Sequence, residues 1–419
     1  MKLIVVSTNA AMTMGGEAVK ALQYVQTLLE QGRDVTLVTH DRCRAALQDA
    51  LPADRVIYVR DSPLMKICWR APGLGRFVNA LFHKAVARQC RQFDPSDVVI
   101  HYLCPISPVE PRFPPRGYRY VIGPLSGNIF YPPGFRQLDS RAGRLQERVY
   151  RPVQWTMGRL SSQYDRADRV LVSGYERTRE ALRWAGCPEA KMLSVCDAGL
   201  DRSFFDRARI RPEQAAPEFV WIGRMVPYKG ADLAIRALAA APVDIRLTLY
   251  GDGPERPRLE ALVAALGLEP RVRFAGWLSH AALAETLSQF RALVFPSLKE
   301  ANGIVMQESM AIGLPVLALR WGGPVGLATD REALFIEADT AGQVVGDLAA
   351  GMTRLAREPD LAAEISQAAR RRAQQVFPWD RVATDWYDAA LSAAPAAARA
   401  QGLQSGQGET GVASSKDTA

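Results

Sequence analysis

The feature that most constrains how this chain can fold is an alternation of short apolar runs and helical patterns, which occurs twice. Each apolar run of strand length is followed by a segment whose apolar residues recur at the helical period. Such alternation is typical of parallel sheets with helices on both faces, so we predict two doubly wound α/β domains. The strands are expected at 2–7, 34–40, 55–59, 97–103, 118–125, 169–174 and 191–199, and then at 218–224, 245–251, 272–277, 292–297, 315–319 and 333–337.

The length of 419 residues also favours two domains, because single cores stop growing well below that size. We assign residues 1–200 to a first domain and residues 218–377 to a second. Residues 201–217 carry two prolines and no clear period, which predicts a linker. Residues 378–392 read as a last helix, and residues 395–419, rich in Ala, Gln, Gly and Ser, as a disordered tail.

The charge is unevenly distributed along the chain. Residues 1–200 hold 28 Lys and Arg against 18 Asp and Glu, and the excess is densest at 51–150, with 15 basic and 7 acidic residues. A basic half predicts an anionic partner, namely a membrane surface, a nucleic acid or a phosphorylated substrate; a surface that only aids solubility is the alternative. The six cysteines form no C-x-x-C pair, and neither a signal peptide nor a membrane-spanning run is evident, so we expect a cytoplasmic protein.

Two carboxylates stand eight positions apart in the stretch 300–324, EANGIVMQESMAIGLPVLALRWGGP. The stretch reads as loop, helix, strand and glycine turn, and it follows the strand at 292–297. Eight helical residues span about 12 Å, the reach from the sugar to the ribose of a nucleotide sugar. We therefore expect Glu300 and Glu308 to bind a hydroxylated ligand. The alternative is that Glu300 caps the helix and Glu308 lies on the surface.

The start of that helix is a candidate phosphate site. Backbone N–H groups at a helix N-terminus point outward and attract anions, so the amides of Asn302, Gly303 and Ile304 are expected to donate to phosphate. A second candidate is the loop IGRMVPYKG at 222–230, which follows a predicted strand. There Gly223 lets the backbone approach a ligand, while Arg224 and Lys229 supply cations. A solvated surface loop is the alternative.

The first domain offers fewer candidates. Gly15 and Gly16 follow the first strand and are placed to donate amides to an anion. His101 ends a strand, so it either faces the space between the domains or is a buried, hydrogen-bonded histidine, and His40 has the same two alternatives. His83 and His280 are predicted on helix surfaces. The sequence contains no D-x-D, H-E-x-x-H or G-x-S-x-G, so no metal site and no hydrolase triad is expected.

Taken together and in order, GRMVPYKG, GDGPE, FPSLKEANGIVMQESMAIGLPV and WGGP resemble the retaining GT-B glycosyltransferases of group 1, also called family 4. The resemblance is nearly complete in the second half and loose in the first. It implies the GT-B fold, two Rossmann-like domains facing a cleft, with the last helix returning to the first domain. It also implies transfer of a hexosyl group from a nucleotide-sugar donor with retention of configuration and without a metal or other cofactor.

The resemblance further implies a role for each matching residue. Arg224 and Lys229 would hold the diphosphate and neutralise the leaving group. Glu300 would orient the transferred sugar, Glu308 would bind the ribose hydroxyls, and Gly16 would approach the diphosphate from the first domain. Where some members carry a histidine on the acceptor side, this chain reads IGPLSGN at 122–128, so His101 is the acceptor-side candidate that we retain.

The basic region at 51–150 carries Trp69, Phe77, Leu81 and Phe82 among its cations and resembles the membrane-facing side of enzymes that glycosylate lipid-linked acceptors. We therefore expect a polysaccharide-precursor or lipid-linked acceptor and peripheral contact with the inner face of an anionic membrane, and no nucleic acid. A GT-B sugar-nucleotide epimerase, an NAD-dependent dehydrogenase and a non-catalytic membrane-surface module are the alternatives. The dehydrogenase would need G-x-G-x-x-G after the first strand, where TNAAMTMGG stands instead.

Overall fold

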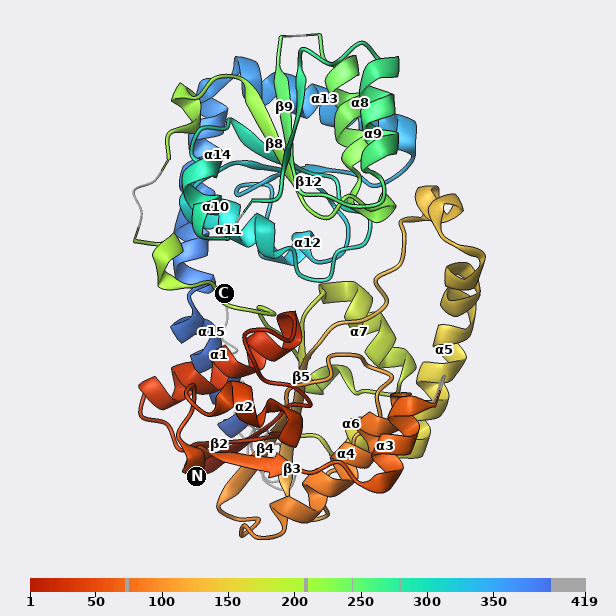
Figure 1. Ribbon diagram of the computed structural model, residues 1–419, viewed down its shortest axis with the longest axis vertical. Coiled ribbons are helices and arrows are strands. Elements are labelled where there is room, and N and C mark those ends of the chain that lie inside the picture. Colours follow the sequence, from red (N-terminus) through yellow and green to blue (C-terminus); the bar gives the residue numbers. More distant parts are fainter. Residues whose placement is uncertain (72–74, 207–209, 243, 279, 393–419) are drawn as a thin grey trace, which may run out of the picture.

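The computed structural model of the chain contains two parallel β-sheets, one above the other in Figure 1, with helices on both faces of each. It describes residues 1–71, 75–206, 210–242, 244–278 and 280–392. The prediction of two doubly wound sheets is confirmed. The domain limits stay a prediction, and "first domain" and "second domain" mean the parts built on the two sheets. The tail predicted at 395–419 lies outside the described residues.

The first strand of the chain, β1, lies inside the first sheet, and the strand order reverses between β1 and β4. All its neighbours pair in parallel, and side chains on both faces are buried, as the continuous apolar runs require. In sheet order the strands are β3 (Val56–Val59), β2 (Val35–His40), β1 (Lys2–Val6), β4 (Val98–Tyr102), β5 (Arg119–Leu125), β6 (Arg169–Val172) and β7 (Met192–Ser194).

The helices of the first domain include α3, which the sequence analysis did not predict. Its start has a recognisable cap: Ser62 Oγ accepts from the Met65 N–H at 3.2 Å, and Pro63 occupies the first helical position. The helices are α1 (Gly16–Glu30), α2 (Arg44–Leu47), α3 (Pro63–Arg70), α4 (Gly75–Cys90), α5 (Arg141–Ser161), α6 (Gln163–Arg166) and α7 (Tyr175–Trp184).

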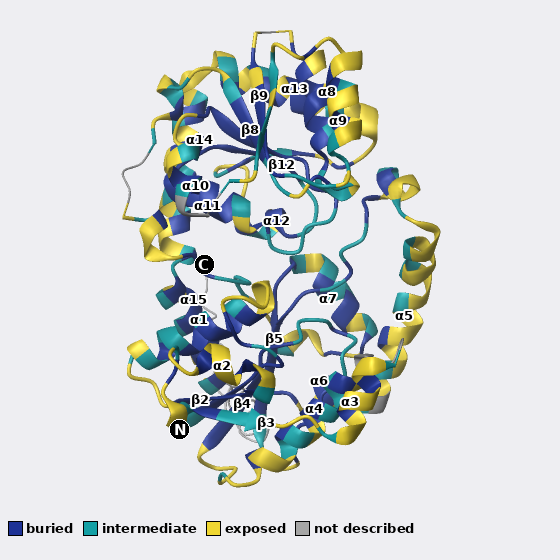
Figure 2. Cartoon of the chain, viewed as in Figure 1, coloured by how far each residue is buried: buried dark blue, intermediate teal, exposed yellow. Residues whose placement is uncertain are grey.

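The second sheet repeats this plan, and its order reverses between β8 and β11. Its strands, in sheet order, are β10 (Val272–Gly276), β9 (Arg246–Tyr250), β8 (Glu218–Ile222), β11 (Ala292–Phe295), β12 (Val316–Leu319) and β13 (Leu334–Ile336). Its helices are α8 (Ala231–Ala240), α9 (Arg256–Ala265), α10 (His280–Leu287), α11 (Ile304–Ile312), α12 (Pro324–Leu327), α13 (Ala341–Arg357) and α14 (Pro359–Val376). Figure 2 shows the strands of both sheets as the buried centre of their domains.

The last helix, α15 (Trp379–Leu391), returns to the first domain and lies beside α1 (Figure 1). Trp386 is fully buried in the core of that domain, edge-on to the ring of Tyr24 on α1 at 5.0 Å between centroids. Its indole N–H also donates to the Cys196 carbonyl at 3.0 Å. The first domain is therefore completed by the C-terminal end of the described chain, as expected.

We predict that Trp386→Ala destabilises the protein by about 3–5 kcal/mol, because it leaves a large cavity and removes the partner of the Cys196 carbonyl. Chemical unfolding followed by circular dichroism measures the loss. Trp277→Ala is the matched control, because that tryptophan is 71% exposed. Equal stability of the two variants would contradict this account of α15.

Candidate functional site

The predicted donor-binding residues gather where the order of the second sheet reverses. In such sheets the connections from two neighbouring strands leave in opposite directions, which opens a crevice at their carboxyl ends. Strand β8 is followed by Arg224 and Lys229, and its neighbour β11 is followed by Glu300. The fold thus brings two stretches some seventy residues apart to one edge, as the sequence analysis expected.

Lys229 and Glu300 form an ion pair at this edge. Lys229 Nζ lies 2.5 Å from Glu300 Oε2, and the two side chains are 23% and 14% exposed. Ser297 Oγ donates to the same carboxylate oxygen at 3.4 Å, and the Lys229 ammonium lies 5.9 Å from the centroid of the Phe295 ring. Both residues are predicted from the sequence to lie in one site, but their pairing with each other is not predicted. Arg224, on the same loop as Lys229, is exposed.

The glycine turn after β12 holds the Glu300 loop in place. The Gly323 N–H donates to the Glu300 carbonyl at 2.9 Å. Gly322 has φ +68°, and a Cβ on it would lie 2.5 Å from that carbonyl oxygen, so only glycine fits there. The glycines of the W-G-G-P motif therefore allow the turn to pack against the backbone of Glu300, the catalytic candidate.

Helix α11 begins later than the sequence analysis assumed. Its first hydrogen bond runs from the Met306 N–H to the Gly303 carbonyl at 2.9 Å, and Gly303 is its N-cap with φ +85°. Glu300 therefore lies in the loop before the helix, so the estimate of eight helical residues between the two carboxylates is wrong. The N–H groups of Gly303 and Ile304 precede the first helical bond, as a phosphate site requires.

Glu308 lies in the middle of α11 and is only 3% exposed. The alternative of a surface glutamate is therefore excluded, and Gly303 rather than Glu300 caps the helix. The neighbouring Gln307 is fully buried and connects Asn302, in the loop before α11, to the first domain. Its Oε1 accepts from Asn302 Nδ2 at 3.1 Å, while its Nε2 donates to the Ala198 carbonyl at 3.2 Å. The sequence analysis overlooked Gln307.

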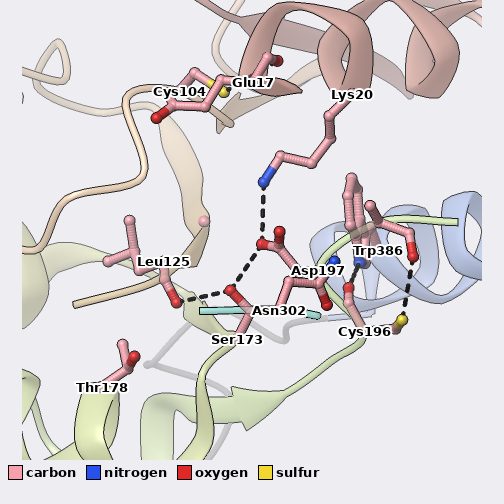
Figure 3. Close-up of polar contacts among 12 residues, drawn as sticks. Glu17, Lys20, Cys104, Leu125, Ser173, Thr178, Cys196, Asp197, Asn302 and Trp386 are labelled. Carbon is pink, nitrogen blue, oxygen red and sulfur yellow. Dashed lines mark hydrogen bonds and ion pairs between the residues drawn. The ribbon is translucent and has the colours of Figure 1, made fainter. Parts of the chain in front are cut away.

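A second overlooked feature lies across from this loop, at the carboxyl ends of the first sheet (Figure 3). Lys20, one turn beyond Gly16 on α1, donates to Asp197 Oδ1 at 3.0 Å, and the side chains are 5% and 15% exposed. Ser173 Oγ lies 2.8 Å from the same oxygen and 3.0 Å from the Leu125 carbonyl. A lysine among the buried positions of α1 was the available signal, but its partner is 177 residues away.

The electrostatic surroundings of Lys20 favour its charged form. Burial by itself lowers the pKa of Lys20, but the opposing Asp197 carboxylate, together with Cys104 and Glu17, outweighs that effect and raises the pKa. The pair links α1 to the segment between β7 and the second domain. Because Asp197 also neighbours Ala198, to which Gln307 donates, helices α1 and α11 are both held against the same short segment.

The remaining first-domain candidates take different positions. Gly15 and Gly16 are exposed at the start of α1, where Gly15 has φ +93°. His101 is fully buried: its Nε2–H donates to the Gly123 carbonyl at 2.6 Å, so Nδ1 accepts from the Tyr24 hydroxyl at 3.2 Å. Burial lowers the pKa of His101 to about 4, although the bond to Gly123 opposes this. Of the two alternatives given for His101, the buried, hydrogen-bonded histidine is the one observed. His101 does not face the space between the domains.

The predictions for the other three histidines have different outcomes. His40 is also fully buried, and burial together with the nearby Arg42 charge lowers its pKa to about 4. The prediction of His83 on a helix surface is wrong, because that face of α4 packs into the first-domain core, where its ring lies 5.4 Å from that of Tyr102. The side chain of His280 lies outside the described residues.

Ser126, in the stretch where some family members carry a histidine, lies close to the Glu300 loop. Both Ser126 Oγ and the Ala301 carbonyl oxygen approach Gly174, at 3.1 and 3.6 Å from a Cβ built there. Ser126 is 8% exposed, and its hydroxyl has no hydrogen-bond partner among the described residues. The two domains therefore meet here, with the ends of β5 and β6 on one side and the loop that contains Glu300 and Ala301 on the other.

We predict that Lys20→Met destabilises the protein by about 3–5 kcal/mol, because it leaves the Asp197 charge largely buried without its cation. The double variant Lys20→Met/Asp197→Asn should recover most of that loss, since no charge then stays buried. Urea unfolding of the two variants and the wild type measures this difference. A double variant as unstable as the single one would show that packing, not charge, matters at this position.

Comparisons with known proteins agree with this arrangement. Residues 203–372 match the family model of the glycosyl transferases group 1. The chain is 31% identical over 251 residues to the D-inositol 3-phosphate glycosyltransferase of Streptomyces avermitilis, covering 54% of this chain and 53% of that protein. It is 36% identical over 193 residues to the lipopolysaccharide core biosynthesis glycosyltransferase LpsD of Rhizobium meliloti, covering 44% and 54%. The chain thus spans about half the length of the curated relatives that it matches.

The fold as a whole has solved counterparts. The crystal structure of Anabaena Alr3699/HepE in complex with UDP and glucose superposes with a TM-score of 0.61 at 16% identity, covering 97% of this chain and 100% of that one. At that identity the likeness concerns the fold alone. The chain therefore has the GT-B fold, and its second domain, through residues 203–372, is similar to the glycosyl transferases of group 1.

Proposed function

We propose that this protein is a retaining glycosyltransferase that moves a hexosyl group from a nucleotide-sugar donor to a hydroxyl of a polysaccharide-precursor or lipid-linked acceptor. The observation that carries the proposal is the Lys229–Glu300 pair at the reversal point of the second sheet, beside the first turn of α11. A cation, a carboxylate and free amides at one edge match the diphosphate and the hydroxyls of such a donor. The relatives' names, which include a lipopolysaccharide core enzyme, favour the same chemistry.

In the proposed reaction, the bond between the anomeric carbon and the diphosphate oxygen breaks, and its electron pair leaves with the nucleotide diphosphate. Arg224, Lys229 and the amides of α11 stabilise the negative charge that develops there. The acceptor oxygen bonds to the anomeric carbon on the same face, and its proton passes to the departing diphosphate. Glu300 orients the sugar, and we propose that the two cations replace a metal ion.

The buried position of Glu308 supports its proposed role as a ribose ligand. A carboxylate that is 3% exposed on a packed helix has a fixed orientation, so it can bind two vicinal hydroxyls with little loss of entropy. Gly16 is proposed to approach the diphosphate from the opposite domain, where its lack of a side chain leaves room: no atom lies within 4 Å of a Cβ built there.

We expect one of a panel of UDP-, GDP- and ADP-sugars to be hydrolysed slowly or transferred, and Lys229→Ala to lower kcat by about 100- to 1000-fold, as the loss of one charge-stabilising group does. Coupled detection of the released nucleotide diphosphate measures the rate. Lys84→Ala, which removes an exposed lysine of α4, is the control and should behave like the wild type. If no donor is bound or consumed, or if Lys229→Ala retains full activity, the proposal fails.

We also propose that the first domain touches an anionic membrane, chiefly through α5. This helix lies at the outer edge of the molecule and is largely exposed (Figure 2). Leu145, Val149 and Val153 repeat every four residues on one face and are 61%, 43% and 41% exposed. Arginines flank this apolar stripe at Arg141, Arg144, Arg148 and Arg151. In the part of the chain that the structure describes, no helix has the length and apolar character to cross a bilayer.

The apolar and aromatic residues that are predicted on the membrane side divide into two groups. Trp69 and Phe77 are 69% and 57% exposed, whereas Phe82 is fully buried in the core under α4 and Leu81 is partly buried against it. The expectation for Phe82 is therefore wrong. Leu64 and Ile67 of α3, 53% and 60% exposed, add apolar surface to the same domain. Exposed apolar side chains next to arginines are typical of helices that lie in a membrane interface.

We predict that the protein floats with vesicles of phosphatidylglycerol and phosphatidylethanolamine at low salt and is released by high salt, since each interfacial arginine contributes about 1 kcal/mol through screened attraction. Leu145→Asp/Val149→Asp should abolish flotation. Leu266→Asp, on the 39% exposed leucine that ends α9, is the control. Flotation that survives the double change would show that α5 is not the contact.

A further inference from the structure

A short segment of the second domain, residues 321–326, contacts both the first domain and the backbone of Glu300. It begins at Trp321, after β12, and ends at Gly326 in α12. Within it, the Gly323 N–H donates to the Glu300 carbonyl at 2.9 Å. Helix α7 of the first domain points its first turn toward this segment (Figure 1). We call residues 321–326 the bridging turn.

Trp321 joins the bridging turn to two parts of the first domain. Its indole N–H donates at 3.0 Å to the carbonyl of Phe130, which lies between β5 and α5. The guanidinium carbon of Arg177, on α7, lies 3.8 Å from the centroid of its ring, which is a close cation–π contact. Trp321 also packs against the core of the second domain. Its orientation is therefore determined by contacts from both domains.

Tyr175, the first residue of α7, makes a further contact with the bridging turn. Its hydroxyl donates to the Gly326 carbonyl, and a Cβ built on Gly326 would fall within the tyrosine ring, so the ring lies directly on the glycine backbone. Tyr175 has φ +55°, a left-handed conformation that is unfavourable for a residue with a bulky side chain. Such strain persists only where the surrounding structure fixes it, and it is concentrated at functional sites. The contact with the bridging turn is thus kept despite backbone strain.

The loop that contains Glu300 also meets the first domain directly. Lys299, the residue before Glu300, pairs with Asp139 of the first domain at 3.3 Å between Nζ and Oδ1, and its ammonium lies 4.2 Å from the centroid of the Tyr131 ring. The side chains of Lys299 and Asp139 are 24% and 11% exposed, so the pair is largely shielded from solvent. The backbone of Glu300 therefore lies between two contacts with the first domain, one at Lys299 and one through the bridging turn.

We propose that Trp321, Tyr175 and Arg177 are positioning residues: through the bridging turn, the first domain sets the orientation of Glu300 toward the transferred sugar. The assignment rests on the proposed glycosyltransferase function and adds to it a dependence of the donor site on the facing domain. The link is the hydrogen bond from Gly323 to the Glu300 carbonyl. A shift of the bridging turn displaces that carbonyl and, with it, the side chain of the same residue.

The first test removes the contacts from the first-domain side in the full-length chain. Tyr175→Ala/Arg177→Met should lower kcat/KM for the donor by about ten- to a hundredfold, as a small misplacement of a substrate-orienting group does. Binding of the nucleotide diphosphate should stay within about twofold of the wild type. Arg183→Met is the matched control, because Arg183 lies on the same helix and pairs there with Glu176. It should behave like the wild type.

Variants of Trp321 test the same contact from the second domain. Trp321→Leu removes both the indole N–H and the ring beside Arg177, and it should lose as much activity as the first-domain double variant. Trp321→Phe keeps an aromatic ring for the guanidinium and loses only the N–H, so it should retain most of the activity. Thermal melting followed by circular dichroism shows whether each variant is folded at the assay temperature.

A double-mutant cycle with Glu300→Gln separates positioning from general structural damage. Because the contacts act through Glu300, Tyr175→Ala/Arg177→Met should have almost no further effect on kcat/KM in a Glu300→Gln background. Losses that multiply in the combined variant would overturn the proposal. Full activity of Tyr175→Ala/Arg177→Met in the wild-type background would overturn it as well.

Hydrogen exchange measured by mass spectrometry separates this proposal from the function on which it rests, because it requires no donor. Peptides that contain Gly323 should exchange faster in Tyr175→Ala/Arg177→Met than in the wild type or in Arg183→Met, since the amide bonded to Glu300 is less well held. Faster exchange in a protein that consumes no donor would support the positioning of Glu300 while the transferase proposal fails. Unchanged exchange would overturn the positioning role even if a donor is consumed.

Discussion

The arrangement of the two domains depends on a short hydrogen-bonded junction at Leu200. The chain leaves the first domain there and returns at Pro378, and the two passages run side by side. Leu200 N–H donates to the Phe377 carbonyl at 2.7 Å, and Trp379 N–H donates to the Leu200 carbonyl at 3.3 Å. These two hydrogen bonds tie the two passages of the chain to each other, so the domains are joined through one compact junction.

The candidate residues of the proposed function lie at strand ends. In each sheet the order of strands reverses once, and in the second sheet Lys229 and Glu300 form their ion pair at that point. Helix α11 is connected to this junction, since its Gln307 donates to the carbonyl of Ala198, two residues before Leu200. The position of α11, and with it Glu308, therefore depends on the segment at which the chain leaves the first domain.

Much of this architecture was predictable from the sequence, because strand length and helical period are local properties. The strands begin and end within a few residues of the predicted bounds, and the Arg224, Lys229 and Glu300 motifs fall on the expected edge. The errors are of three physical kinds. Glu300 lies outside α11 because Gly303, with its positive φ, starts the helix. His83 is buried because a helix in a basic region still turns one face to the core. Lys20–Asp197 and Gln307–Ala198 join residues over 100 positions apart, which no local pattern encodes.

The Lys229–Glu300 pair has a consequence for the order of recognition in the proposed reaction. In this structure each charge has the other as its counterion, so neither charge is unpaired in the partly buried site. A diphosphate that draws Lys229 toward itself frees the Glu300 carboxylate, which then needs hydroxyl donors. In the proposed reaction a nucleotide sugar would supply both at once, whereas a nucleotide diphosphate alone would leave the carboxylate with the Ser297 hydroxyl as its donor. The complete donor would therefore satisfy both charges and the product of transfer only one of them, which would favour release of the product.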